Sequence, residues 1–322
     1  MRLRDLLVRA TWLTLVTVAG CAESPTPVMA EDVDDEAAAR PSTPTGGNAP
    51  TSDPPSARSG SEDPPAPPST PSKPAPVTFR VLSYNVAGLP QGISGSDPLL
   101  NTPQISPKLN PFELVLVQED FAYHDALVAS ATHPHRSTPM ATTSDFGDGL
   151  NALSRFPFGA LSRTKWSKCN GIIDQSNDCL TPKGFSRFVL DLGDGRSVDV
   201  YNMHFDAGRG QGDVNARQAQ VDQLVAAIAQ QSAGKAVIVA GDTNMKASDE
   251  ATLQKLLTGS SLDCACRTLQ CAEPERIDRI MFRSSATLTL TPKSYAVESS
   301  FVDLSGSPLS DHEPASATFE AD

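Results

Sequence analysis

Residues 235–244 read KAVIVAGDTN, a short apolar run that ends in a glycine and two polar side chains. The β-branched residues at its centre are typical of a strand that is buried on both faces. Asp242 and Asn244 follow Gly241 and lie two residues apart, so they face the same way. An ordinary Asp/Asn turn would have the same composition. Evidence from other segments of the chain is therefore needed to tell a functional strand end from an ordinary turn.

Five other segments with strand-like patterns also place catalysis-capable side chains at a strand end or beside one. The order in which they occur along the chain is the main functional signal in this sequence. The residues concerned are Asn85 after 77–84, Gln118 and Glu119 at the end of 112–119, His204 after 197–203, Asp278 within 277–282, and Ser310, Asp311 and His312 before 314–319.

The remaining segments predict a mixture of strands and helices. Gly and Pro in residues 91–111 predict a surface loop, and residues 120–131 are compatible with a helix. A Gly-Asp-Gly turn at 193–195 predicts a hairpin of strands 184–192 and 197–203. We expect a strand over 147–154 and a helix over 214–230, capped by Asp213.

The amino-terminal segment predicts export. Residues 1–21 have a basic start, a short apolar core and small residues before Cys21, as in a secretory signal. The run Val-Ala-Gly-Cys at 18–21 resembles the bacterial lipobox, which implies lipidation of Cys21 and attachment to the cell envelope, with the outer membrane expected because Ala22 replaces a retention signal. An ordinary signal peptide and a secreted protein are the alternative. Residues 22–76 hold 14 of the 27 prolines and predict a disordered spacer.

The folded domain is expected over residues 77–322. It carries 20 Lys and Arg against 28 Asp and Glu, a net charge of −8. An acidic domain argues mildly against tight, sequence-independent binding of nucleic acid, which depends on cationic contacts to phosphate. A nuclease stays possible, because a bound divalent cation adds positive charge locally.

Five cysteines lie in this domain, and an exported protein favours disulfides. Cys169 and Cys179 flank a short loop, and we expect them to pair. Cys271 is expected to pair with Cys264 or Cys266, which leaves one cysteine over. A zinc cluster of these last three is the alternative, although no His lies near them in the sequence.

The ordered set of polar strand ends resembles the endonuclease/exonuclease/phosphatase superfamily, which includes pancreatic DNase and bacterial neutral sphingomyelinases. The resemblance spans residues 78–320. It implies an α/β (α+β) fold of the DNase I type, a four-layer sandwich of two packed mixed β-sheets flanked by helices. Each motif alone also has an ordinary structural explanation, but six motifs in order are unlikely to coincide. The resemblance is carried by Asn85, Gln118-Glu119, His204, Gly241-Asp242-Thr243-Asn244, Ile277-Asp278 and Ser310-Asp311-His312.

The resemblance implies a metal site and a proton-transfer site. Glu119 and Asn85 would hold Mg²⁺ or another divalent cation such as Mn²⁺ or Ca²⁺, with Asp311 as a further candidate, since these are hard oxygen ligands. His312 is the candidate general base, and Asp278 would orient it.

The other catalytic candidates would act on the water and the phosphate. Asp242 would activate or orient the attacking water, Asn244 would donate to the phosphate, and His204 would contact the phosphate or the leaving oxygen. Which of His312 and Asp242 takes the proton stays open at this point.

The subfamily is indicated by Trp166, Lys168-Cys169, the run from Cys179 to Gly184 and the run from His204 to Gly208, which look most like the sphingomyelinases. Residues 294–310 lack the aromatic-rich hairpin with which those enzymes enter membranes. We expect a monomeric, metal-dependent phosphodiesterase of the sphingomyelinase or phospholipase C type, acting on a phospholipid headgroup. A secreted nuclease acting on nucleic acid and an inactive binding homologue are the alternatives.

Overall fold

A computed structural model describes residues 74–141, 146–171, 178–271 and 276–322. The signal peptide, Cys21 and almost all of the spacer expected over 22–76 lie outside the described residues. Among the helices that are described, none has the length and apolar character needed to cross a bilayer.

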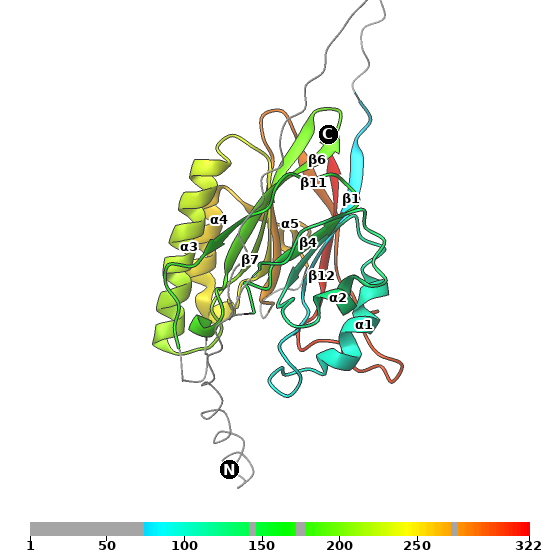
Figure 1. Ribbon diagram of the computed structural model, residues 1–322. Coiled ribbons are helices and arrows are strands. Elements are labelled where there is room, and N and C mark those ends of the chain that lie inside the picture. The colour runs from blue at the N-terminus through cyan, green and yellow to red at the C-terminus, as the bar shows by residue number, and fades with distance from the viewer. Residues whose placement is uncertain (1–73, 142–145, 172–177, 272–275) are drawn as a thin grey trace, which may run out of the picture. The chain divides into compact units, whose positions relative to one another are not determined.

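Two six-stranded mixed sheets form the centre of the domain (Figure 1). The first has the order β11-β12-β1-β2-β4-β3 and the second β5-β6-β7-β8-β10-β9. In the first sheet the strands are β1 (Val77–Asn85), β2 (Leu114–Gln118), β3 (His135–Arg136), β4 (Asn151–Ser154), β11 (Leu290–Val297) and β12 (Ala315–Ala321). In the second they are β5 (Ser162–Lys165), β6 (Gly184–Gly193), β7 (Arg196–His204), β8 (Val237–Asp242), β9 (Asp263–Cys264) and β10 (Asp278–Arg283).

One parallel pair of strands lies at the centre of each sheet. β1 and β2 are parallel in the first, and β7 and β8 are parallel in the second, whereas the other named pairs are antiparallel. The carboxyl ends of a parallel pair lie at the same edge of their sheet. Each sheet therefore presents two strand ends together, and the polar residues noted in the sequence follow these ends.

Apolar side chains fill the space between the sheets and cover both outer faces. Between the sheets lie Phe79, Phe188, Ile238 and Phe319, all almost fully buried. Helices cover the outer face of each sheet (Figure 1). The helices are α1 (Pro98–Lys108), α2 (His124–Val128), α3 (Gln211–Gln231), α4 (Glu250–Ser260) and α5 (Ala265–Thr268), with 3₁₀ turns η1 (Asp178–Leu180) and η2 (Ala247–Asp249). The four-layer sandwich expected from the sequence is confirmed.

A buried amide pair joins the two sheets close to the functional end. Gln118 in β2 donates its Nε2 to Asn202 Oδ1 in β7 at 2.7 Å. Asn202 in turn donates to the backbone oxygens of Val117 and Asn151 at 2.9 and 3.1 Å. Both side chains are fully buried, where an unmade hydrogen bond would cost about 1–3 kcal/mol. This network fixes how the strand ends of one sheet face those of the other.

Several boundaries expected from the sequence were wrong. The segment 91–111 is not only a loop, because it contains α1, with Pro98 in the first turn and Pro103 and Pro107 further inside. Proline suits the first turn, since its missing N–H has no helical partner there. The two later prolines each remove a backbone donor, and the buried side chains of Thr102, Ile105 and Ser106 hold the helix against the first sheet.

The helix expected over 120–131 shortens to α2, and the strand expected over 147–154 shortens to β4. Helix α3 begins at Gln211, three residues before the expected start. Asp213 still caps this helix, but it does so from inside the first turn, where its Oδ2 accepts from the Gly210 N–H at 2.8 Å.

The cysteines form disulfides Cys169–Cys179 and Cys266–Cys271. The first was expected, and the second resolves the choice left open for Cys271. Cys264 lies outside both disulfides and is buried against the second sheet. The alternative zinc cluster is wrong, because Cys266 and Cys271 are bonded to each other.

Candidate active site

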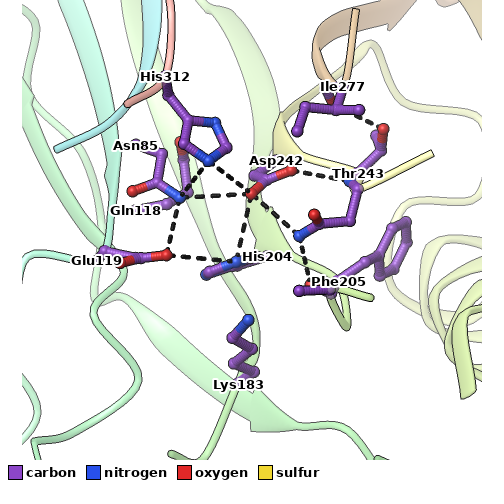
Figure 2. Close-up of polar contacts among 12 residues, drawn as sticks. Asn85, Gln118, Glu119, Lys183, His204, Phe205, Asp242, Thr243, Ile277 and His312 are labelled. Atoms are coloured by element: carbon purple, nitrogen blue, oxygen red, sulfur yellow. Dashed lines mark hydrogen bonds and ion pairs between the residues drawn. The ribbon is translucent and has the colours of Figure 1, made fainter. Parts of the chain in front are cut away.

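The polar strand ends of both sheets meet in one place (Figure 2). Asn85 ends β1, and Glu119 follows the last residue of β2. In the second sheet, His204 ends β7 beside Asp242 of β8, and Asp242 also pairs with Asp278 of β10. Residues up to 227 positions apart in the sequence are thus brought within contact distance.

Asn85 contacts three members of the cluster (Figure 2). Its Nδ2 lies 3.0 Å from Glu119 Oε1, 3.3 Å from Asp242 Oδ2 and 3.4 Å from His312 Nε2. Its Oδ1 accepts from the Ala87 N–H at 3.1 Å. The amide therefore points its donor into the cluster and positions the acidic side chains around it.

His204 lies on the other side of the same carboxylates. Its Nε2 is 3.3 Å from Asp242 Oδ2 and 3.9 Å from Glu119 Oε1. The side chain is almost fully buried, and its Nδ1 has no hydrogen-bond partner among the described residues. An imidazole held this way between two carboxylates can also donate from Nε2 to an oxyanion that enters the cluster.

His312 and Asp278 form a second arrangement typical of catalytic sites. His312 Nδ1 donates to Asp278 Oδ2 at 2.9 Å, and Nε2 lies 3.7 Å from Asp242 Oδ2. Burial lowers the pKa of His312, but the hydrogen bond to Asp278 and the charge of Asp242 outweigh burial and raise it. Burial raises the pKa of the Asp278 carboxyl. The hydrogen bond fixes the orientation of the ring and leaves Nε2 facing the cluster.

Asp242 is held by a set of donors. Its burial would raise its pKa, but the hydrogen bond from His204 and the charge of His312 bring the pKa well below its usual value. Asn244 donates to it twice, from the backbone N–H at 2.8 Å and from Nδ2 at 3.1 Å. Asn244 Nδ2 also donates to the Phe205 oxygen at 3.0 Å. In this arrangement the Asn244 amide orients Asp242. A donation from Asn244 to the phosphate, expected from the sequence, stays a prediction.

Backbone conformation is unusual at two residues of the cluster. Glu119 has φ 57° and Asn244 has φ 50°. Both values lie in the left-handed region, which residues other than glycine seldom adopt. Such a conformation costs roughly 1–2 kcal/mol. It aims each side chain back toward the cluster instead of letting the chain continue away from it. Non-glycine strain of this kind gathers at functional sites.

Gly241, directly before Asp242, has a structural reason to be glycine. Its φ is 144°, and a β-carbon there would stand 1.9 Å from the Met203 oxygen of the neighbouring strand β7. Any side chain would push β8 away from β7. The glycine therefore keeps Asp242 next to His204.

Lys183 is a cation at the edge of this cluster (Figure 2). Its Nζ pairs with Asp178 Oδ1 at 2.5 Å, and the Asp178 side chain is buried. Burial lowers the pKa of Lys183, but the charges of Asp178 and Glu119 outweigh it and raise the pKa. The sequence pattern alone does not mark Asp178 as a site residue. Its only signal was its position five residues before the Lys-Gly pair that opens β6.

Asp311 does not join the cluster through any contact seen here. Its carboxylate is directed at the loop before α1, where a β-carbon on Gly95 would stand 2.8 Å from Oδ2. Its charge still acts on the neighbouring imidazole, since it contributes to raising the pKa of His312. A role for Asp311 as a direct metal ligand stays a prediction.

The donor set of the cluster suits a hard divalent cation. Glu119 offers a carboxylate that is only partly buried, and Asp242 offers a second one within reach of the same imidazole. Asp242, Asp278 and His312 each place one ligand atom within 4.8 Å of the others. Because Asp278 and His312 bond to each other, the Glu119 side of the cluster is the better place for the ion. Carboxylate oxygens are the ligands that Mg²⁺ prefers in proteins.

The architecture and the cluster define a DNase I-like sandwich protein. Residues 98–263 match the profile named Endonuclease/Exonuclease/phosphatase family 2. The chain belongs to this endonuclease/exonuclease/phosphatase family.

Sphingomyelinases are among its similar relatives in sequence. The "Sphingomyelinase" of Mycobacterium tuberculosis is 37% identical over 265 residues, which cover 75% of this chain and 52% of that protein. The chain thus spans about half the length of the curated relatives it matches.

Solved structures share the fold at lower identity. A Staphylococcus aureus beta toxin mutant with bound magnesium ions is 14% identical, with a TM-score of 0.56 over 75% of this chain and 99% of that one. The D. rerio TDP2 complexed with single strand DNA product is 18% identical, with a TM-score of 0.60 over 75% of this chain and 98% of that one. The fold is common to proteins of different substrates, so the substrate has to be argued from this chain.

Proposed function

We propose that this chain is a metal-dependent phosphodiester hydrolase of the sphingomyelinase or phospholipase C type. The observation that carries the proposal is the pair of His312 and Asp278 beside the Glu119 and His204 side of the cluster. A base, an orienting carboxylate and an acidic cation site are the groups that hydrolysis of a phosphodiester needs. The 37% identity to sphingomyelinases supports the choice of substrate class.

In the proposed reaction each group has a role that its contacts support. His312 Nε2 accepts the proton of the attacking water, and Asp278 stabilises the imidazolium that forms. Asp242 orients that water, because its Oδ2 lies within 3.3–3.7 Å of His204 and His312. His204 donates from Nε2 to a phosphoryl or leaving oxygen. Asn85 and Asn244 keep the carboxylates in place.

Glu119, with Asn85 beside it, would hold the divalent cation. The bound cation supplies positive charge that offsets the charge developing on the phosphoryl oxygens. Magnesium, which is present in the beta toxin structure, is the first ion to test, with Mn²⁺ and Ca²⁺ as alternatives.

Export and anchoring form part of the proposal. The two disulfides fit an oxidising compartment. We expect lipidation at Cys21 to hold the protein at the cell envelope, with residues 22–76 as the spacer. Mass spectrometry of the protein from its native host tests this expectation. An unmodified Cys21, or cleavage elsewhere, would remove the anchor.

The deciding experiment compares substrates side by side. Vesicles of sphingomyelin, vesicles of phosphatidylcholine and a DNA duplex are each incubated with the full chain and MgCl₂, with and without EDTA. We expect release of phosphocholine from sphingomyelin that EDTA abolishes. Faster cleavage of DNA would favour the nuclease instead. No turnover of any of the three, with folded protein, would identify an inactive homologue.

A further inference from the structure

A cleft of about 400 Å³ opens directly beside the candidate active site. Glu119 and Lys183 line it, so it is continuous with the cluster described above. Asp178, the ion-pair partner of Lys183, and Thr181 also line it. The remaining lining side chains are apolar: Leu89, Ile93, Phe121, Phe146, Leu180 and Ala207. A largely apolar cleft that contains the proposed metal ligand favours a substrate with an apolar part next to its charged group.

The apolar side chains at this cleft are unusually exposed. Ile93, Phe146 and Leu180 are 62%, 48% and 56% accessible to solvent. They make up half of the six large apolar side chains that are strongly exposed in the described part of the chain. Their gathering at one cleft is informative, since apolar residues scattered singly over a surface need no explanation. We call these three residues the apolar rim.

Each rim residue is held by the backbone that also positions a site residue. Ile93 follows Asn85 in a turn fixed by hydrogen bonds from Ile93 N and Ser94 N to the Pro90 oxygen, at 2.9 and 3.2 Å. Ser94 Oγ donates to the Ala87 oxygen at 2.7 Å. The turn is thereby tied to the end of β1.

The second rim residue, Phe146, is held through Phe121, which lies two residues after Glu119. The Phe121 N–H donates to the Glu119 backbone oxygen at 2.9 Å. The Phe121 ring covers Gly149, where a β-carbon would come within 2.6 Å of it. Phe146 packs on this ring, with centroids 6.3 Å apart.

The third rim residue is held through Lys183. Leu180 ends η1, which carries Cys179 of the Cys169–Cys179 disulfide and Asp178 of the Lys183 ion pair. Trp166 N donates to the Lys183 oxygen at 2.9 Å and holds the start of β6 in place. The three rim residues are therefore fixed around the catalytic cluster by separate elements of the fold.

We propose that the apolar rim is the surface with which this chain docks onto a phospholipid bilayer, so that a lipid phosphate reaches Glu119 while its apolar part enters the cleft. The inference rests on the proposed function. A phospholipid places a charged phosphate next to an apolar body, and the cleft places charged Glu119 and Lys183 next to an apolar wall. The aliphatic rim residues Ile93 and Leu180 suit a lipid surface. The net charge of −8 over residues 77–322 disfavours a nucleic acid as the occupant.

Vesicle sedimentation tests the proposal without requiring activity. The full chain carrying Cys21→Ser, which excludes a lipid at that position, is mixed with phosphatidylcholine vesicles in EDTA and centrifuged. The test variant adds Ile93→Ser, Phe146→Ser and Leu180→Ser. The matched control adds Leu304→Ser, since Leu304 is 106% exposed and does not line the cleft. We expect the test variant to need about tenfold more lipid, or more still, for half-maximal sedimentation. We expect the control to behave as the parent does.

Two further measurements keep the result interpretable. Leu180→Ser and Leu180→Phe are compared singly, and the apolar replacement is expected to keep binding that the polar one weakens. The second measurement compares a water-soluble phosphodiester, bis(4-nitrophenyl) phosphate, with sphingomyelin in vesicles. Hydrolysis of the soluble compound is expected to fall much less in the test variant than hydrolysis of the vesicle lipid.

The proposal is overturned if the parent does not sediment, if the test variant sediments as the parent does, or if the rim variants lose binding to a single-stranded oligonucleotide instead. A parent that sediments through its rim and hydrolyses nothing would remove the proposed function and leave the docking surface standing.

Discussion

His312 Nδ1 and Asp278 Oδ2 are 2.9 Å apart, although the two residues lie 34 positions apart in the sequence. Asp278 opens β10 of the second sheet, and His312 lies in the segment that leads into β12 of the first. The hydrogen bond therefore depends on the packing of one sheet on the other. Anything that shifts the sheets will separate base and carboxylate.

Replacing the orienting carboxylate should reduce turnover more than binding. Asp278→Asn removes the charge that stabilises the His312 imidazolium and leaves the side-chain volume unchanged. We expect kcat to fall on the order of 10²-fold with little change in KM. The measurement is steady-state hydrolysis of whichever substrate the side-by-side comparison of vesicles and DNA selects. Asp263→Asn, at an exposed position in β9, is the control and should keep its activity. Full activity of Asp278→Asn would remove Asp278 from the site.

Glu119→Gln should weaken binding of the divalent cation. The substitution keeps the shape and removes the charge of the proposed ligand. Because a ligand of the folded state raises stability, MgCl₂ should raise the melting temperature of the parent and raise that of Glu119→Gln much less. Glu320→Gln lies near the far end of β12, pairs with Lys293, and should respond as the parent does. An equal magnesium shift in Glu119→Gln would place the ion elsewhere.

The buried pair of Arg217 and Asp249 should be a large contributor to stability. Arg217 is fully buried, and its Nη2 donates to Asp249 Oδ1 at 2.9 Å. Its Nη1 also donates to three successive backbone oxygens at 206–208, just after His204. Arg217→Met removes the close, buried partner of the Asp249 carboxylate, and we expect the free energy of unfolding to fall by about 3–5 kcal/mol.

Urea denaturation measures this loss. Arg209→Met is the matched control, because Arg209 lies 3.9 Å from the same Asp249 but is half exposed. Its loss should stay within about 1 kcal/mol. Equal losses for the two variants would mean that burial of the pair is not what matters.

Two histidines should give stability a pH dependence of opposite sign. Burial lowers the pKa of His133, whose Nε2 donates to the Phe112 oxygen at 2.8 Å. Its contribution is therefore present above the unfolded value of 6.5 and is lost as pH falls. The hydrogen bond to Asp120 raises the pKa of His124. That contribution is present below 6.5 and is lost as pH rises through the folded value.

Denaturation between about pH 8 and about pH 5 tests both signs. His133→Gln should lose less stability than the parent on acidification, because it removes a group that resists protonation in the folded state. His124→Gln should lose more than the parent does. Parallel curves for all three proteins would contradict the assignment.

The sequence by itself determined which residues end the central strands. Apolar runs such as 236–240 are followed by a polar pair, and a strand has few ways to place such a pair other than at its end. The parallel strand pairs then bring Asn85, Glu119, His204 and Asp242 together, as the order of motifs implied. The pairing of Cys169 with Cys179 was also predictable, because the two are close in the chain.

Only the tertiary structure decided where the remaining groups point. Helix α1 forms despite its prolines because Ile105 is buried against the first sheet. Asn244 turns back onto Asp242, and Asp311 faces Gly95 instead of the cluster. The apolar rim likewise combines residues from three separate loops. Local sequence fixes a strand and its end, but the direction of a side chain beyond that end depends on packing between elements that are distant in the chain.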